Sequence, residues 1–399
     1  MDLNTMNLRL RTLTVFAGIR KDPVVAALGQ MLAAGAGQAD SDVFIDRYCA
    51  FAAALYERDI NWSRYLHDLV MADDNICVRR AAAGNMITVP LADSLAQELA
   101  ILQDLSRVTS GDLTVGADYD GYLPEWETAE YDFAGDYAKH LEELPLKGYG
   151  IFAKYYSFRV EDGEIVPILC PDPVRLDELV RYEAQREPVI ANTKAFLQGL
   201  PANNVLLYGD AGTGKSSTVK AIVNEYHDQG LRMIEIKQSQ FMQIPNVLEM
   251  LADNPLRFIL FIDDLSFDSG NDEYIALKNI LEGGAYDTRG NTLIYATSNR
   301  RHFIKEDASA RSGSEMFVND TIQETMSLAA RFGLTVTFQK PAKNLYLEIV
   351  DALAGRAGIK MEQDELHTQA EAFAIRASGR SPRTARQFVD TLNIKKHIQ

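Results

Sequence analysis

The chain has few cysteines and no long apolar run. Its 399 residues include three cysteines, Cys49, Cys77 and Cys170, which are far apart and form no Cys-x-x-Cys or Cys/His metal pattern. Such a sparse, odd set suits a reducing compartment better than a disulfide framework, and we interpret the three as buried small apolar side chains. No stretch of about 18 uninterrupted apolar residues occurs, so we expect no transmembrane helix. Because the first residues also lack the apolar core of a signal peptide, we expect a cytoplasmic location.

Basic charge is also scarce. The 56 acidic residues outnumber the 40 lysines and arginines, which gives a formal net charge of −16. This charge argues against broad non-specific affinity for nucleic acid or for an anionic membrane surface, although a local basic face is compatible with it. A content of 47% hydrophobic and 24% charged residues is ordinary for a soluble globular protein, and the length allows two or three domains.

The most informative segment is residues 209–216. It reads Gly-Asp-Ala-Gly-Thr-Gly-Lys-Ser, and it follows an apolar run and precedes a helix-compatible stretch, 217–226. Strand, glycine loop and helix in this order are the context of a phosphate-binding P-loop, in which backbone N–H groups surround phosphate oxygens. Lys215 would reach the β- and γ-phosphates, and the Ser216 hydroxyl would ligate Mg²⁺. The sequence therefore predicts a nucleoside triphosphate site made by Gly209, Asp210, Ala211, Gly212, Thr213, Gly214, Lys215, Ser216 and Ser217.

Acidic and amide side chains follow two further apolar runs. Residues 258–262 read Phe-Ile-Leu-Phe-Ile, which is typical of a strand buried on both faces, and Asp263 and Asp264 come directly after it. We expect Asp263 to hold Mg²⁺ through its water shell and Asp264 to orient the attacking water. Many hydrolytic P-loop proteins have the longer Glu at the second position, so hydrolysis here is expected to be slow or to depend on assembly. At the end of the next strand, Asn299 is our first candidate and Ser298 our second for contact with the γ-phosphate or the water.

The P-loop, the Asp-Asp strand end and a Thr-Ser-Asn strand end, in this order, resemble the AAA+ ATPase superfamily. The resemblance implies that ATP is the nucleotide and that a segment preceding the P-loop contacts its adenine. Residues 176–182 occupy that place, with Leu179 and Tyr182 as the candidate contacts.

The same resemblance implies two functional arginines. Arg331, in the run Arg-Phe-Gly-Leu before the last strand, stands where AAA+ proteins have an arginine finger that acts in trans. Arg383, in the run Gly-Arg-Ser-Pro-Arg-Thr-Ala-Arg, aligns best with the sensor arginine of a helical lid, with Arg380 and Arg386 as alternatives. Arginines entering from a lid or a neighbouring subunit would stabilise the charge that develops on phosphate oxygens.

A closer resemblance covers roughly residues 160–390. The phrases at 203–209, 258–267, 297–302 and 327–334 look like a bacterial AAA+ family catalogued as domain of unknown function eight-fifteen. In that family an aspartate at the position of Asp264 is usual, which favours an active enzyme. The resemblance barely covers the first 150 residues.

The N-terminal part reads as helical. Apolar residues recur at spacings of three and four in 43–56 and 91–105, which indicates helices packed on one another; a partner-binding groove is the less favoured interpretation. From 112 to 143 acidic residues are opposed mainly by Lys139 and are interleaved with aromatics. We interpret this stretch as a solvated connector with anchored aromatics, and an interaction segment for a basic partner is the alternative.

The fold class predicted is α/β: a P-loop parallel sheet flanked by helices, a small C-terminal helical lid and a largely helical N-terminal accessory domain. The expected strands are 204–208, 232–236, 258–262, 292–296 and 334–338. The expected parts are a helical accessory domain at 1–110, an acidic aromatic connector with a small β hairpin at 111–170, the nucleotide-binding domain at 171–339 and the lid at 340–399.

The function predicted is Mg²⁺-dependent binding and hydrolysis of ATP by a homo-oligomer in which Arg331 acts in trans. Hydrolysis would be coupled to remodelling or loading of a macromolecule, with a protein partner engaged through the N-terminal domain. The alternative is a nucleotide-binding switch or adaptor with little hydrolysis. A P-loop kinase is disfavoured because nothing beyond the loop suggests an acceptor site.

Overall fold

The computed structural model describes residues 2–37, 40–114, 119, 121–266, 272–281, 290–299, 330–377 and 379–398. The chain divides into two compact units. Unit 1 comprises Met1–Lys154 with Asp253–Pro255, and unit 2 comprises Tyr155–Ala252 and Leu256–Gln399.

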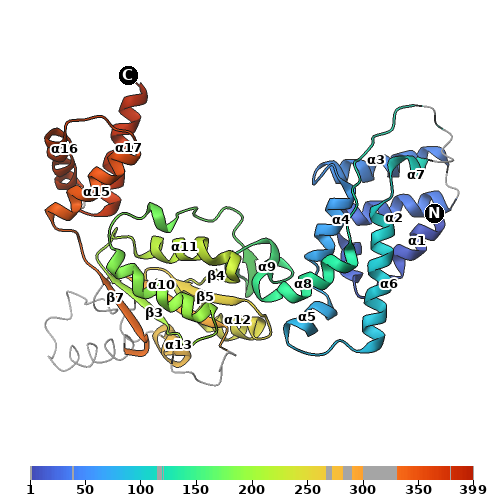
Figure 1. The fold of residues 1–399 in the computed structure, drawn as a ribbon, viewed down its shortest axis with the longest axis horizontal. Coiled ribbons are helices and arrows are strands. Elements are labelled where there is room, and N and C mark those ends of the chain that lie inside the picture. Colours follow the sequence, from blue (N-terminus) through green and yellow to red (C-terminus); the bar gives the residue numbers. More distant parts are fainter. Residues whose placement is uncertain are drawn as a thin grey trace. The chain divides into compact units, whose positions relative to one another are not determined.

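Unit 1 is helical in its described residues, and the apolar spacings identify its helices. The predicted face in 43–56 lies on α3, which buries Phe44, Tyr48, Phe51 and Leu55, while Val43 stays exposed. The helices of this unit are α1 Leu3–Arg11, α2 Pro23–Ala36, α3 Ser41–Tyr56, α4 Trp62–Met71, α5 Ile76–Ala82, α6 Val89–Ser106, α7 Ser110–Thr114, α8 Phe133–Lys147 and α9 Ile151–Lys154 (Figure 1).

The stretch expected to be an acidic connector, 111–170, divides in the structure at Lys154. Its first part belongs to unit 1, where Trp126, Phe133 and Tyr137 are buried in the core. Trp126 packs edge-to-face against Phe51 with ring centroids 5.0 Å apart, and its indole nitrogen donates to the carbonyl oxygen of Val108 at 3.0 Å. Anchored aromatics were expected in this stretch, and the acids beside Trp126 and Phe133, such as Glu127 and Asp132, are exposed.

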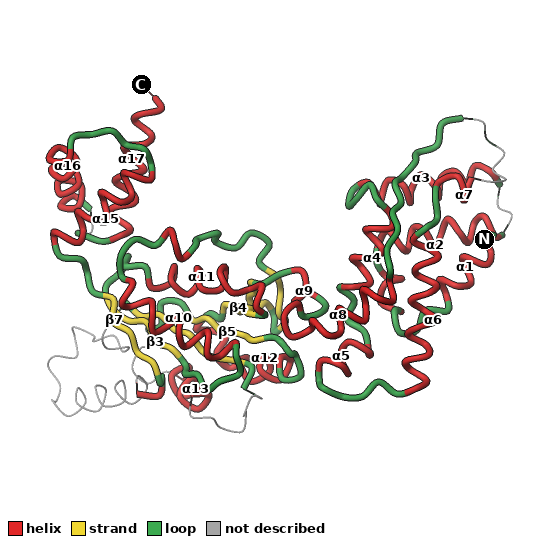
Figure 2. The backbone as a smooth tube through the Cα atoms, in the orientation of Figure 1, coloured by secondary structure: helices red, strands yellow, loops and turns green. Residues whose placement is uncertain are grey.

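Unit 2 contains a seven-stranded sheet in the order β2-β1-β4-β5-β6-β3-β7. Every neighbouring pair is parallel except β1 and β2. The predicted strands are present, and their ends differ from the prediction by no more than two residues. The strands are β1 Ser157–Glu161, β2 Glu164–Pro167, β3 Val205–Gly209, β4 Leu231–Glu235, β5 Arg257–Ile262, β6 Thr292–Ser298 and β7 Leu334–Phe338. Figure 2 shows them as one group flanked by helices, which confirms the predicted fold class.

The predicted hairpin is β1 and β2. Its two-residue turn is formed by Asp162 and Gly163, whose φ angles of 50° and 85° are the left-handed pair that a tight hairpin requires. β1 pairs in parallel with β4, so the hairpin extends the nucleotide-binding sheet.

The C-terminal helices form the lid, and it shares a hydrophobic core with the sheet. Tyr346 and Val350 of α15 belong to the same buried cluster as Leu207 of β3 and Phe261 of β5. The α-helices among the described residues of unit 2 are α10 Glu183–Leu197, α11 Lys215–Tyr226, α12 Ile244–Leu251, α13 Asp272–Leu281, α15 Lys343–Arg356, α16 Gln363–Arg376 and α17 Pro382–Ile398 (Figure 1).

Within the described ranges no helix is long and apolar enough to cross a membrane. The cysteine interpretation is right for Cys77, which is buried, and wrong for Cys49 and Cys170, which are exposed.

Candidate nucleotide site

The loop between β3 and α11 is shaped by three glycines with positive φ, Gly209, Gly212 and Gly214. A Cβ at Gly209 would lie 2.0 Å from the carbonyl oxygen of Phe338, so only glycine fits against the end of β7. At Gly214, where φ is 97°, an added Cβ would meet nothing within 4 Å, and the backbone angle alone favours glycine. The loop can therefore turn its backbone toward a ligand without side chains in the way.

Asp210 fastens this loop to the end of β7. Its N–H donates to the Phe338 carbonyl at 2.9 Å, and its carboxylate accepts from the N–H of Lys340 at 2.8 Å. Gly209 and Asp210 are absent from the lining of the pocket described below, whereas residues 211–217 line it. The predicted binding set therefore separates into two loop-anchoring residues and seven that face the pocket.

Lys215 is buried at the start of α11, with 5% of its surface exposed. Its Nζ donates to the carbonyl oxygens of Gly209 at 3.0 Å and Asp210 at 2.7 Å, and to Oδ1 of Asn299 at 2.8 Å. Burial lowers the pKa of Lys215 from its usual 10.5, although nearby carboxylates oppose the shift. A phosphate oxygen would give this ammonium a charged acceptor in place of neutral ones, and such hydrogen bonds are about twice as strong.

A carboxylate and two hydroxyls meet at the ends of β5, β6 and the P-loop. Oδ1 of Asp263 accepts from Oγ of Ser216 at 2.6 Å and from Oγ1 of Thr297 at 2.5 Å. Thr297 was not among the predicted site residues. Strand alternation could have found it, because Thr297 and Asn299 lie on one side of β6 and Ser298 on the other. Ser298, our second candidate at this strand end, instead donates to the carbonyl oxygen of Leu265 at 2.8 Å and does not line the pocket.

Asp264 is held in a left-handed conformation by two hydrogen bonds. Its φ is 55°, its N–H donates to Thr297 Oγ1 at 3.0 Å, and its Oδ1 accepts from Nδ2 of Asn299 at 2.6 Å. Since the amide oxygen of Asn299 accepts from Lys215, Asn299 joins the P-loop ammonium to the second carboxylate. A non-glycine residue at positive φ costs about 1–3 kcal/mol and persists only where its surroundings fix it, which occurs most often at functional sites.

The segment before α10, which is predicted to contact the adenine, forms another side of the pocket. Leu179, Val180 and Tyr182 line it. The Tyr182 hydroxyl donates to the carbonyl oxygen of Gln339 at 2.7 Å, and its ring stacks on Phe338 at 5.7 Å between centroids. Burial, aided by the charge of Asp210, raises the pKa of Tyr182 to about 12, so it remains a neutral hydrogen-bond donor at physiological pH.

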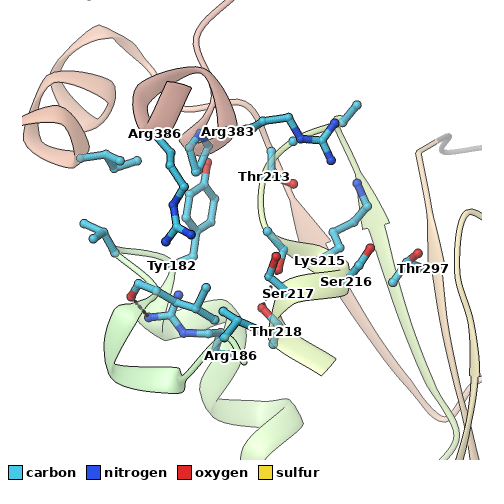
Figure 3. Close-up of a pocket in the computed structure, with 18 of the residues that line it drawn as sticks. Tyr182, Arg186, Thr213, Lys215, Ser216, Ser217, Thr218, Thr297, Arg383 and Arg386 are labelled. Atoms are coloured by element: carbon cyan, nitrogen blue, oxygen red, sulfur yellow. Dashed lines mark hydrogen bonds between the residues drawn. The ribbon is translucent and has the colours of Figure 1, made fainter. Parts of the chain in front are cut away.

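The lid reaches the pocket through α17. Arg383 and Arg386 both line it, and the Arg383 N–H donates to the carbonyl oxygen of Gly212 at 3.2 Å. Arg380 instead forms an ion pair with Glu371 inside the lid at 2.6 Å. Of the three candidate sensor arginines, the structure brings two to the pocket, and Figure 3 shows both of them together with the P-loop residues.

The pocket has a volume of about 470 Å³. Its charged lining residues are Glu178, Arg186, Lys215, Asp263, Asp264, Arg383 and Arg386. Ile349 and Leu353 of α15 are among the apolar ones. Arg331 does not line it; this residue comes just before β7, which lies at the edge of the sheet.

The donor set fits Mg²⁺ better than a cation that needs a cage of protein ligands. Ser216 Oγ and Asp263 Oδ1 lie together beside Lys215, and the described part of the chain holds no group of three or more His, Cys, Asp or Glu able to bind a metal. Mg²⁺ in phosphoryl-transfer sites is held by one or two protein ligands together with waters and substrate phosphates.

Comparisons with known proteins identify a family and partial relatives. Residues 152–396, more than half of the chain, match the family described as Protein of unknown function (DUF815). The Replication factor C large subunit of Staphylothermus marinus is 36% identical over 117 residues, which are 27% of each chain. That of Thermococcus kodakarensis is 32% identical over 103 residues, 23% of this chain and 20% of that protein. The chain thus spans about a quarter of the length of these curated relatives.

Among solved structures, the RuvB Holliday junction branch migration motor of Thermotoga maritima aligns with a TM-score of 0.39 and 21% identity over 56% of this chain and 67% of that one. A variant of the same protein aligns at 18% identity and a TM-score of 0.38 over the same shares of the two chains. The family match, together with the P-loop and the Asp-Asp strand end beside it, identifies the chain as a member of the DUF815 family within the AAA+ P-loop ATPase superfamily.

Proposed function

We propose that the protein binds and hydrolyses ATP with Mg²⁺ in a homo-oligomer, and that hydrolysis remodels or loads a macromolecular partner. One observation carries the hydrolytic part. Ser216, Asp263, Thr297, Asp264 and Asn299 form an unbroken series of hydrogen bonds that ends at Lys215. Groups suited to hold phosphate, metal and water are thereby fixed relative to one another, which is the main contribution a protein makes to phosphoryl transfer.

Each group has a distinct role in the proposal. The loop backbone and Lys215 bind the phosphates, and Ser216 and Asp263 hold Mg²⁺, which would neutralise charge on the phosphate oxygens. Asp264 orients the water and accepts its proton. The amide of Asn299 keeps the Asp264 carboxylate turned toward the pocket, because its nitrogen donates to that carboxylate while its oxygen faces the Lys215 ammonium.

Two arginines would complete the site. Arg383 lies against the P-loop from the lid, and in the proposal it reports the bound nucleotide to the lid. Arg331 stands outside the pocket of its own chain and before an edge strand, a location that suits insertion into the site of a neighbouring subunit. Unit 1 has a hydrophobic core of its own and is the part proposed to engage a protein partner.

ATP turnover by purified protein tests the proposal. Lys215→Ala should abolish turnover, whereas Lys360→Ala, at an exposed lysine of the lid, should leave it unchanged. Turnover by Lys215→Ala at the wild-type rate would refute the assignment.

The shared-site part of the proposal needs a mixing experiment. Specific activity should rise with protein concentration. Arg331→Ala and Lys215→Ala should each be inactive alone and partly active when mixed, because the Lys215→Ala subunit still supplies Arg331 to an intact P-loop. Specific activity that is independent of concentration, with no complementation, would show that each chain works alone.

A nucleotide-dependent switch is the second candidate. The observation that favours it is the short side chain of Asp264, whose carboxylate already accepts a hydrogen bond from Asn299 at 2.6 Å. Tight ATP binding with turnover at background, even at high protein concentration, would establish the switch.

A further inference from the structure

The segment 176–180, which precedes α10, forms the wall of the pocket at the end away from Lys215. Several of its backbone carbonyls have no hydrogen-bond partner within the segment itself. Leu176–Glu178 form the 3-10 turn η2, and Leu179 follows it. The last carbonyl groups of a short helix point beyond its end, where no further backbone N–H reaches them. Partners for the carbonyls of Asp177, Glu178 and Leu179 must therefore come from elsewhere in the fold.

Arg356 of the lid supplies two of these partners. It is the last residue of α15, and its Nη1 donates to the Glu178 carbonyl oxygen at 2.7 Å while its Nη2 donates to that of Asp177 at 2.8 Å. Two adjacent acceptors match the planar fork of a guanidinium, which a lysine ammonium cannot reproduce.

Arg186 holds the same wall from α10. It is 7% exposed, and its Nη2 donates to the Leu179 carbonyl oxygen at 3.0 Å. Its Nη1 donates to the carbonyl of Arg181, which together with Tyr182 takes a left-handed φ. The wall is thus held by one arginine from the nucleotide-binding domain and one from the lid.

α15 presents two adjacent stripes to this region. Ile349 and Leu353 line the nucleotide pocket, whereas Ala352 and Arg356 line a neighbouring cavity of about 430 Å³. Both stripes follow the four-residue spacing of one helix face. Segment 179–180 lines both cavities, so it is a thin wall between the nucleotide and the Arg356 side of the lid.

We propose that Arg356 is a positioning residue for the base end of the pocket, one that ties the lid to the wall contacting the base. The inference rests on the proposed function, since it assigns the end of the pocket away from Lys215 to the base. Arg383 joins the lid to the P-loop at the phosphate end, and Arg356 joins it at the opposite end. In the proposal, a base bound at this end changes the position of the lid through Arg356, without the contacts that the phosphates make with the P-loop.

Steady-state kinetics of the full chain test the proposal. Arg356→Ala should raise the KM for ATP by about tenfold and leave kcat within about twofold. The rise in KM is modest because the two hydrogen bonds that are lost hold the wall of the pocket and do not contact the nucleotide itself. Arg356→Lys should give an intermediate KM, because it keeps the charge without the fork. Arg376→Ala is the matched control: an exposed arginine in the last turn of the lid helix α16, expected to change neither constant.

A second measurement separates the base end from general damage to the lid. The inhibition constant of inorganic tripolyphosphate, which has no base, should be the same for wild type and Arg356→Ala. An unchanged KM for ATP in Arg356→Ala would overturn the inference, and so would equal weakening toward ATP and tripolyphosphate. Wild-type protein without ATP turnover would instead refute the proposed function, and the two failures are distinguishable because only one of them requires the variant.

Discussion

Thr297 allows the sharpest test of how the acidic pair is held. Its hydroxyl donates to Asp263 at 2.5 Å and accepts from the Asp264 N–H at 3.0 Å, and its side chain is 1% exposed. Thr297→Val keeps the shape of the side chain and removes both hydrogen bonds. Thr297→Ser removes one methyl group and keeps both.

The size of the effect follows from the partners. A hydrogen bond to a charged group contributes about 1.5–3 kcal/mol, and a buried N–H left without a partner costs about 1–3 kcal/mol. Because Asp263 and Asp264 are both exposed, we take the lower part of each range, which gives a loss of about 2–4 kcal/mol in the free energy of unfolding for Thr297→Val. The left-handed turn at Asp264 also loses its anchor, and we expect kcat to fall about 10- to 100-fold, at 1.36 kcal/mol per factor of ten.

Denaturant unfolding and phosphate release measure the two quantities on the same preparations. Thr297→Ser should retain most of the stability and most of the turnover. Wild-type turnover in Thr297→Val would refute the reasoning, as would a serine variant impaired as severely as the valine variant.

Three further predictions concern charge, loop shape and unit 1. Burial lowers the pKa of Lys215, so between the lowered pKa and the usual 10.5 the unfolded chain binds more protons than the folded one. The free energy of unfolding of wild type, relative to that of Lys215→Met, should therefore rise with pH across this window and stay constant below it. Denaturant unfolding at successive pH values measures it. Gly209→Ala should lower the free energy of unfolding by over about 3 kcal/mol, because its methyl group would meet the Phe338 carbonyl. Gly214→Ala should lower it by only about 1–2 kcal/mol, because there only the backbone angle is strained. Thermal unfolding compares the two variants, and equal losses would contradict the fit of the loop against β7. The buried carboxylate of Glu98 accepts from three consecutive backbone N–H groups and one hydroxyl, so Glu98→Gln should destabilise unit 1 by about 2–4 kcal/mol while ATP turnover at low temperature is unchanged.

The sheet and the phosphate side of the pocket were predictable because their signals are local. A strand buried on both faces is a continuous apolar run, and 258–262 could be identified without knowing its neighbours. Lys215 and Ser216 follow from the geometry of one loop. Asp263 follows from the rule that the carboxyl ends of parallel strands meet at one edge of the sheet.

The remainder depends on groups that are distant in the sequence. Arg356 and Glu178 are 178 residues apart, and no pattern around either indicates that the carbonyl at one needs the guanidinium at the other. Trp126 lies among acids, and composition indicated an anchored aromatic in a solvated stretch without identifying Phe51 of α3 as the ring it packs against. Thr297 was missed for a different reason. The polar strand end was identified, but the alternation that places Thr297 on the same side of β6 as Asn299 was not used.

The hairpin β1–β2 also alters how the sheet meets its surroundings. Without it, β4 would end the sheet and present Leu231, Met233 and Ile234 beside a free ladder of N–H and C=O groups, an arrangement that promotes pairing with other chains. With it, the outermost strand has four residues and ends in Pro167, which has no N–H to donate. Association of copies through this edge is therefore disfavoured. Among the described strands, the other edge at which the sheet could be extended by a second copy is β7, the strand that Arg331 precedes.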